Sequence, residues 1–363
     1  MMASPAIDGL EAFAYTIATD CPEGDGTLEW DSTTLVLVRI EAGAHIGLGY
    51  TYCDRAVLAV ISSLKTMILG AQCGDLAKIM CECQAKVRNF GRSGIAACAL
   101  SALDIALWDL KAHWLDLPLV ELLGKATGPV PVYGSGGFTT YDESRLRDQL
   151  AGWVEQGCRW VKMKVGADPD RDPDRIAAAK EAIGSAQLFV DANGAFTSGV
   201  ALRFAASVEQ AEIRWFEEPV TSDDEAGLRH VRGRLPPGME LAAGEYVYTL
   251  DDARRLLESE SVDVLQCDVT RCGGITGFMK IAALAEAFHI DLSGHCAPSA
   301  HLHAANAVPR LRHLEWFHDH VRIEQMLFDG AATVSNGLIQ PDLARAGLGL
   351  EFKFSDAERF RVQ

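Results

Sequence analysis

Charged or polar residues end a series of short apolar runs between residues 160 and 315 of this 363-residue chain. These residues stand 20 to 28 positions apart and are Lys164, Asp191, Glu217, Glu245, Asp268, His295 and Glu315. The spacing is about the length of one strand, one helix and two loops in a βα repeat. Buried parallel strands are near-continuous apolar runs, and barrel active sites lie at the carboxyl ends of such strands. The spacing therefore predicts a βα barrel with these side chains around one rim.

Three carboxylates, from Asp191, Glu217 and Glu245, follow three consecutive apolar runs, so they can converge on one point. Carboxylates at such close range cannot all be ionised without a cation. Hard oxygen ligands favour Mg²⁺, which keeps coordination positions open for water and substrate. Three unrelated salt-bridge partners are the alternative, and the shared register argues against it. We predict one Mg²⁺ per active site.

Lys162 and Lys164 lie two residues apart, so both side chains leave the same face of the predicted strand. A neighbouring ammonium and a nearby Mg²⁺ each disfavour a protonated lysine, which lowers its pKa towards that of a general base. A solvated lysine pair on an edge strand is the alternative. The apolar residues around the pair, Val161, Met163 and Val165, argue against it.

His295 and Asp268 follow neighbouring runs, so the carboxylate can hold one ring nitrogen and raise the basicity of the other. A single histidine is more often structural, but this one has an acidic neighbour and a lysine pair on the same rim. The pattern predicts that His295 acts as an acid or base. His318 and His320 could border the same site.

The first part of the chain predicts a separate α+β domain. Strand patterns at 10–19, 33–41 and 45–50 precede three helical stripes without βα alternation. We place the boundary in the Gly/Pro-punctuated link 124–129, which gives a capping domain at 1–128 and a barrel at 129–330. The C-terminal segment 331–363 is expected to leave the barrel and pack back on the cap.

A polar, Gly-rich segment at 20–29 separates the first two predicted strands. We predict a mobile loop that closes over the barrel mouth and tunes substrate choice. Its acidic residues, Glu23, Asp25 and Glu29, weakly disfavour a second carboxylate at the distal end of the substrate.

Composition excludes several classes of partner. The net charge of -17 argues against nucleic acid or an anionic membrane surface. No run of about 18 uncharged apolar residues is present, and the N-terminus lacks the basic-then-apolar pattern of a signal peptide. Ten scattered cysteines form no paired CxxC units, and Cys81 and Cys83 fit helix packing better than a zinc site. We expect a cytoplasmic homo-oligomer that acts on a small molecule.

Over nearly its full length the chain resembles the mandelate racemase/muconate lactonizing enzymes of the enolase superfamily. The motifs that carry the resemblance are ALDIALWD at 102–109, LLG at 122–124, KMK at 162–164, VDAN at 190–193, EEP at 217–219, GE at 244–245 and DVTRCGG at 268–274. The lysine pair together with His295 and Asp268 looks like the mandelate racemase subgroup, and unlike the lysine-only groups. The implied fold is an α+β cap on a modified TIM barrel, (β/α)₇β.

The resemblance also implies roles for the rim residues. Lys164 is one base, His295 with Asp268 is the opposite acid/base, and Asp191, Glu217 and Glu245 bind Mg²⁺. Glu315 resembles the acid that hydrogen-bonds the substrate carboxylate. The shared first step is removal of the proton α to a carboxylate through an enediolate intermediate, and a Lys or His base with Mg²⁺ is known for this superfamily.

Dehydration of a sugar acid to a 2-keto-3-deoxy acid is the overall reaction that we predict within this subgroup. Polar groups suited to a polyol substrate are Thr139, Thr140 and Asn193. Racemisation or epimerisation of a 2-hydroxy acid is the main alternative, because Lys164 and His295 on opposite faces suit a two-base mechanism. A sugar-lactone cycloisomerase is a third possibility. A non-enzymatic barrel would leave the rim residues without a role.

Overall fold

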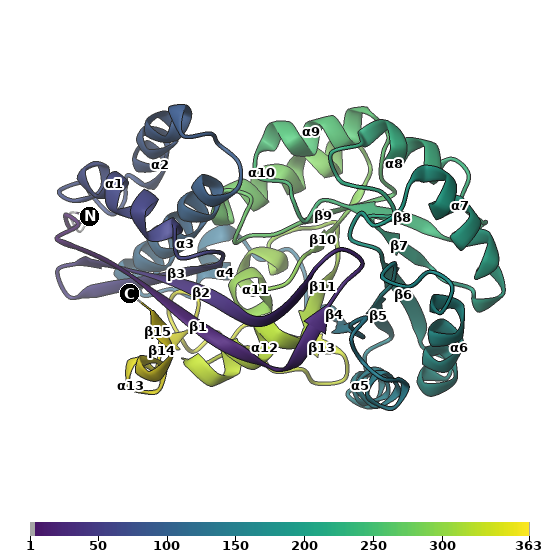
Figure 1. The fold of residues 1–363 in the computed structure, drawn as a ribbon. Coiled ribbons are helices and arrows are strands. Elements are labelled where there is room, and N and C mark those ends of the chain that lie inside the picture. The colour runs from purple at the N-terminus through teal and green to yellow at the C-terminus, as the bar shows by residue number, and fades with distance from the viewer. Residues whose placement is uncertain (1–3, 363) are drawn as a thin grey trace.

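Eight parallel strands close into a barrel in the computed structural model, which describes residues 4–362 (Figure 1). The last barrel strand pairs with the first, from Leu314 opposite Val132 to Phe317 opposite Ser135. The barrel strands are β4 (Val130–Gly136), β5 (Trp160–Lys164), β6 (Gln187–Asp191), β7 (Trp215–Glu217), β8 (Glu240–Ala243), β9 (Val264–Cys267), β10 (Asp291–Gly294) and β11 (Leu311–Phe317).

Seven helices connect these strands in turn, which confirms the (β/α)₇β order. They are α5 (Glu143–Glu155), α6 (Asp172–Ile183), α7 (Ser198–Ser207), α8 (Glu225–Arg232), α9 (Leu250–Glu258), α10 (Gly274–Ala287) and α11 (Pro298–Asn306). A 3₁₀ turn, η2 (Glu209–Ala211), follows α7, and α12 (His318–Leu327) follows the last strand. Aromatic side chains fill the barrel interior below the rim, where Phe189 stacks on Trp215 and Tyr133 lies under the Lys162 ammonium.

The N-terminal cap consists of an antiparallel sheet covered by helices, as predicted. Its elements are β1 (Gly9–Gly24), β2 (Glu29–Ala42), β3 (His45–Tyr52), α1 (Val57–Ile68), α2 (Leu76–Lys86), η1 (Val87–Asn89), α3 (Ile95–Leu115) and α4 (Leu119–Leu123). The expected long loop at 20–29 is wrong, because β1 continues to Gly24 and β2 begins at Glu29. The polar residues of this segment can still pair as strands, because the backbone and not the side chains makes the hydrogen bonds between β1 and β2.

The β1–β2 hairpin extends from the cap across to the barrel, as the purple ribbon in Figure 1 shows. A Cβ on Gly26, at the hairpin tip, would collide with the carbonyl oxygens of Ala192 and Val165 at the strand ends. The hairpin tip therefore lies against the barrel mouth. Further inward, Tyr50 on β3 donates to Glu324 on α12 at 2.6 Å, which ties the cap sheet to the barrel.

The C-terminal segment contacts both parts of the molecule. Its elements are β12 (Phe328–Asp329), β13 (Leu338–Ile339), β14 (Glu351–Phe352), α13 (Phe354–Ala357), η3 (Glu358–Phe360) and β15 (Arg361–Val362). β13 adds antiparallel to β4 of the barrel before β15 adds to β1 of the cap. Within residues 4–362, every helix is too short or too polar to cross a membrane.

Candidate active site

Backbone register places Lys164, Asp191 and Glu217 side by side at the ends of β5, β6 and β7. Glu245 lies just beyond β8. Gly244 before it has a φ of 134°, and a Cβ there would collide with the carbonyl oxygen of Gln266, so the turn requires glycine.

The other predicted rim residues reach the same end of the barrel. Asp268 and His295 lie one residue past β9 and β10, whereas Glu315 lies inside β11, which continues to Phe317. The structure thus brings together every rim residue that the apolar runs predicted.

The carboxylates of Asp191, Glu217 and Glu245 form a compact, buried cluster. Each offers an oxygen, and these oxygens lie within 4.8 Å of one another. Burial and the charge of Asp191 raise the pKa of Glu217 to about 8, although Lys162 opposes this. Glu245 Oε2 is buried, and it pairs with His295 Nε2 at 3.4 Å. An all-oxygen cluster of three buried carboxylates fits Mg²⁺.

Both lysines are held by carboxylates. Lys162 Nζ lies 2.7 Å from Glu217 Oε1 and 2.8 Å from Glu315 Oε1. Lys164 Nζ lies 2.6 Å from Asp191 Oδ2 and 3.0 Å from Asn193 Oδ1.

The electrostatics of the lysines differ from the sequence-based expectation of a lowered pKa. Burial lowers the pKa of Lys164, but the charges of Asp191, Glu245 and Glu217 together outweigh this effect and hold the pKa above its ordinary value. Burial is outweighed in the same way at Lys162, where Glu217 and Glu315 raise the pKa. The expectation counted the neighbouring ammonium and the cation, whereas in the structure each lysine directly faces carboxylates.

His295 and Asp268 form the predicted pair, with Nδ1 2.9 Å from Oδ2. Burial would raise the pKa of Asp268, but the hydrogen bond from His295 and the charge of Arg271 hold it well below its usual range. The aspartate is therefore ionised and fixes the ring orientation. His295 Nε2 faces Glu245 Oε2 at 3.4 Å, on the side of the three clustered carboxylates.

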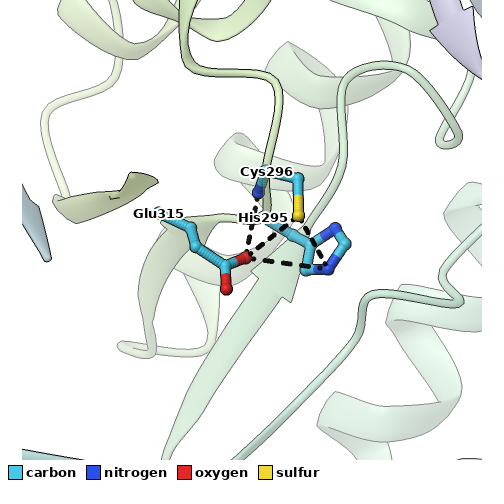
Figure 2. A group of neighbouring side chains, drawn as sticks. All are labelled: His295, Cys296 and Glu315. Carbon is cyan, nitrogen blue, oxygen red and sulfur yellow. Dashed lines mark hydrogen bonds and ion pairs between the residues drawn. The ribbon is translucent and has the colours of Figure 1, made fainter. Parts of the chain in front are cut away.

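Cys296 lies beside His295 and Glu315, although no sequence pattern assigned it a role. Figure 2 shows its thiol and the His295 ring turned towards the same carboxylate oxygen of Glu315. Cys296 Sγ lies 3.3 Å from His295 Nε2, and the Cys296 N–H donates to Glu315 Oε2 at 3.0 Å. Ser135 donates to the other Glu315 oxygen at 2.6 Å.

Thr139 and Thr140, which we predicted to bind substrate, both have hydroxyls that contact the hairpin. The Thr139 hydroxyl donates to the carbonyl of Asp25 at 2.9 Å, and the Thr140 hydroxyl donates to the carbonyl of Pro22 at 2.7 Å. Both hydroxyls are therefore used to anchor the hairpin. Asn193 differs, because its side chain contacts Lys164 directly.

A cavity of about 730 Å³ is lined in part by Thr27 of the hairpin, Asn193, Glu218 and Tyr246, but not by the three clustered carboxylates, Lys164 or His295. This volume is within the range that holds small ligands. Glu218 is buried with a φ of 37°, and its Oε1 has no hydrogen-bond partner among the described residues. A strained, unpaired carboxyl at the cavity wall is a feature that the apolar-run pattern did not reveal.

Comparisons with known proteins agree with this geometry. The chain matches the model for the mandelate racemase / muconate lactonizing enzyme N-terminal domain at 26–124 and the enolase C-terminal domain-like model at 145–357. It is 35% identical over 332 residues to 3,6-anhydro-alpha-L-galactonate cycloisomerase of Streptomyces coelicolor, covering 88% of this chain and 90% of the relative. It is 33% identical over 324 residues to L-talarate/galactarate dehydratase of Salmonella typhimurium, covering 86% of this chain and 78% of the relative.

A solved structure gives the same result. A racemase from Streptomyces coelicolor with bound magnesium superposes with a TM-score of 0.92 at 32% identity, covering 98% of this chain and 100% of that chain. The chain therefore belongs to the mandelate racemase/muconate lactonizing enzyme family of the enolase superfamily.

Proposed function

We propose that this protein is a magnesium-dependent dehydratase of a sugar acid, which removes the proton α to the carboxylate and yields a 2-keto-3-deoxy acid. The observation that carries the proposal is the meeting of three buried carboxylates, a lysine and a histidine–aspartate pair at one barrel mouth. Asp191, Glu217 and Glu245 would hold the ion. When bound, Mg²⁺ supplies positive charge that stabilises the developing enediolate and draws the charge of Asp191 away from Lys164.

Lys164 is the proposed base for the α-proton. Its ammonium is buried, and its contacts with Asp191 and Asn193 fix its direction. A fixed group loses little freedom when the substrate arrives, which favours proton transfer at a single carbon. Lys162 lies between the carboxylates of Glu217 and Glu315. Its positive charge is proposed to attract the substrate carboxylate.

His295 is the proposed acid for the departing β-hydroxyl. Asp268 holds Nδ1, so Nε2 is the nitrogen left to deliver a proton towards the substrate side. Glu315 was predicted to donate to the substrate carboxylate. Burial would raise its pKa, but Lys162 and His295 hold that pKa well below its usual range. It is therefore ionised in this structure, and it must gain a proton before it can donate.

Two other outcomes use the same first step. The cycloisomerase relative supports ring opening of a cyclic sugar derivative, and the racemase structure supports return of the proton to the α-carbon. The dehydratase relative and a polar cavity that suits a polyol support elimination of water as the primary proposal.

The proposal is tested by incubating the protein and MgCl₂ with a library of mono- and diacid sugars, and by following 2-keto products with ¹H NMR. At least one acid should give a 2-keto-3-deoxy product, and Lys164→Met should abolish it. Inverted substrate without keto acid would replace the dehydratase by an epimerase. Absence of product, inversion and α-proton exchange across the library would overturn the proposal.

A further inference from the structure

Asp20, Glu23 and His318 meet where the β1–β2 hairpin crosses the start of α12. Each offers one ligand atom, and these atoms lie within 4.8 Å of one another. Asp20 Oδ2 is 3.0 Å from His318 Nε2. A register shift between Ala18 and Glu23 leaves Asp20 without a partner on β2, so this part of the hairpin bends out of regular pairing. Two of the three residues belong to the cap and the third to the barrel.

Glu23 is a fully buried carboxyl group that is only half satisfied. Its Oε2 accepts a hydrogen bond from the Trp30 indole at 2.9 Å. Its Oε1 has no hydrogen-bond partner in the part of the chain that the structure describes. Asp319, next to His318, is also fully buried and likewise keeps Oδ2 without a partner. Buried carboxylate oxygens usually have hydrogen-bond partners. Two without partners at the seam between the hairpin and the start of α12 therefore require a cause.

The cations of this region contact other oxygens. Arg145 pairs with Asp20 Oδ1 at 3.0 Å, and Arg322 pairs with Asp319 Oδ1. Glu23 forms no ion pair among residues 4–362. The seam therefore has a deficit of positive charge at Glu23.

We propose that Asp20, Glu23 and His318 form a second divalent-cation site, which joins the cap hairpin to the barrel. One imidazole nitrogen with two carboxylates suits Mn²⁺ or Zn²⁺, because imidazole is a softer ligand than the all-oxygen set that Mg²⁺ prefers. Water completes the coordination, and Asp319 Oδ2 is available to accept a hydrogen bond from it. The site shares no residue with the Asp191–Glu217–Glu245 cluster, so variants can remove the ligands of each site separately.

Mn²⁺ is the probe that distinguishes the two sites. The full chain is stripped of metal and titrated with Mn²⁺, and free ion is measured by electron paramagnetic resonance. Wild type should bind two ions per chain, whereas Glu217→Gln and His318→Asn should each bind one. Pulsed measurements on Glu217→Gln should detect a ¹⁴N coupling from the His318 ring, and the ion left in His318→Asn should lack that coupling.

Glu23→Gln is the second variant, because glutamine keeps the shape of the side chain but cannot carry the negative charge of a carboxylate ligand. It should weaken the binding of the second ion at least tenfold. His289→Asn, at an exposed histidine after α10, is the matched control and should keep both ions. A single Mn²⁺ per wild-type chain would overturn the proposal. A second ion that binds equally well to His318→Asn and Glu23→Gln would also overturn it.

Discussion

His295 Nδ1 lies 2.9 Å from Asp268 Oδ2, across the ends of two neighbouring barrel strands. The other aspartate oxygen accepts from both the backbone N–H and the hydroxyl of Thr270, each at 2.7 Å. Thr270 thus fixes the carboxylate, and the carboxylate fixes the imidazole. This chain of contacts leaves Nε2 as the atom through which His295 is proposed to transfer a proton.

Asp268→Asn should lower kcat by about 10²- to 10⁴-fold, because an amide facing Nδ1 disturbs the tautomer and the charge of the ring. The melting temperature should change little, since Asn keeps the oxygen that accepts from Thr270. Steady-state kinetics and thermal melts measure both effects. Asp291→Asn, at the opposite end of β10, is the control and should leave kcat within about twofold. An unchanged kcat in Asp268→Asn would remove the aspartate from the proposed mechanism.

Glu217→Gln and Asp191→Asn should each abolish measurable turnover while the circular dichroism spectrum stays native. Each variant removes one charge from the metal-binding cluster, so Mg²⁺ affinity should fall at least tenfold in calorimetric titration. Glu240→Gln, at the start of β8, is a matched control at the far end of the barrel. Full activity after exhaustive chelation of the wild type would contradict the metal requirement.

Tyr50→Phe should destabilise the protein by about 1–3 kcal/mol, because it leaves the buried carboxylate of Glu324 without its 2.6 Å donor from the cap. Tyr52→Phe is the comparison, since its hydroxyl donates over 3.3 Å to the carbonyl of His320. The Tyr52 variant should lose less stability in urea unfolding. Equal losses would mean that the charged partner contributes nothing to cap docking.

Asp104 should make stability depend on pH. It is fully buried between α3 and α10, and burial raises its pKa from 3.8 to about 7. Above pH 3.8 the unfolded chain loses this proton while the folded chain keeps it, so the contribution of Asp104 to stability falls as pH rises. The fall is about 1.4 kcal/mol per pH unit up to the folded pKa.

Asp104→Asn removes this titration, so its stability relative to wild type should rise between pH 4 and pH 7 and then level off. Urea unfolding at several pH values measures the difference. Asp116→Asn, at an exposed position after α3, should show no such trend. A constant difference between Asp104→Asn and wild type across this range would contradict the assignment.

The rim residues were predictable because their positions depend on strand register alone. Lys164, Asp191 and Glu217 end buried parallel strands, and the apolar runs mark those ends without any tertiary information. The cap was predictable from the change between strand and helix periodicity. The family motifs then added roles that the spacing does not supply.

Other parts of the site depend on contacts between distant segments. Cys296 and Ala297 both adopt positive φ, of 52° and 39°, without the glycine or asparagine that usually signals such a turn. Thr139 and Thr140 appeared suited to substrate, yet their hydroxyls bond to a hairpin more than 110 residues away in sequence. The hairpin tip was mistaken for a loop because residues 20–29 are polar and rich in glycine.

Solvent-deuterium exchange at the α-carbon tests the central claim most directly. ¹H NMR in D₂O with Mg²⁺ and the best sugar acid should show keto acid from the wild type. His295→Asn should form no keto acid but should place deuterium at the α-carbon of recovered substrate, because one base and the metal suffice for that step. Lys164→Met should show neither. Deuterium entry that survives in Lys164→Met, or that disappears in His295→Asn, would contradict the assignment of Lys164 as the base.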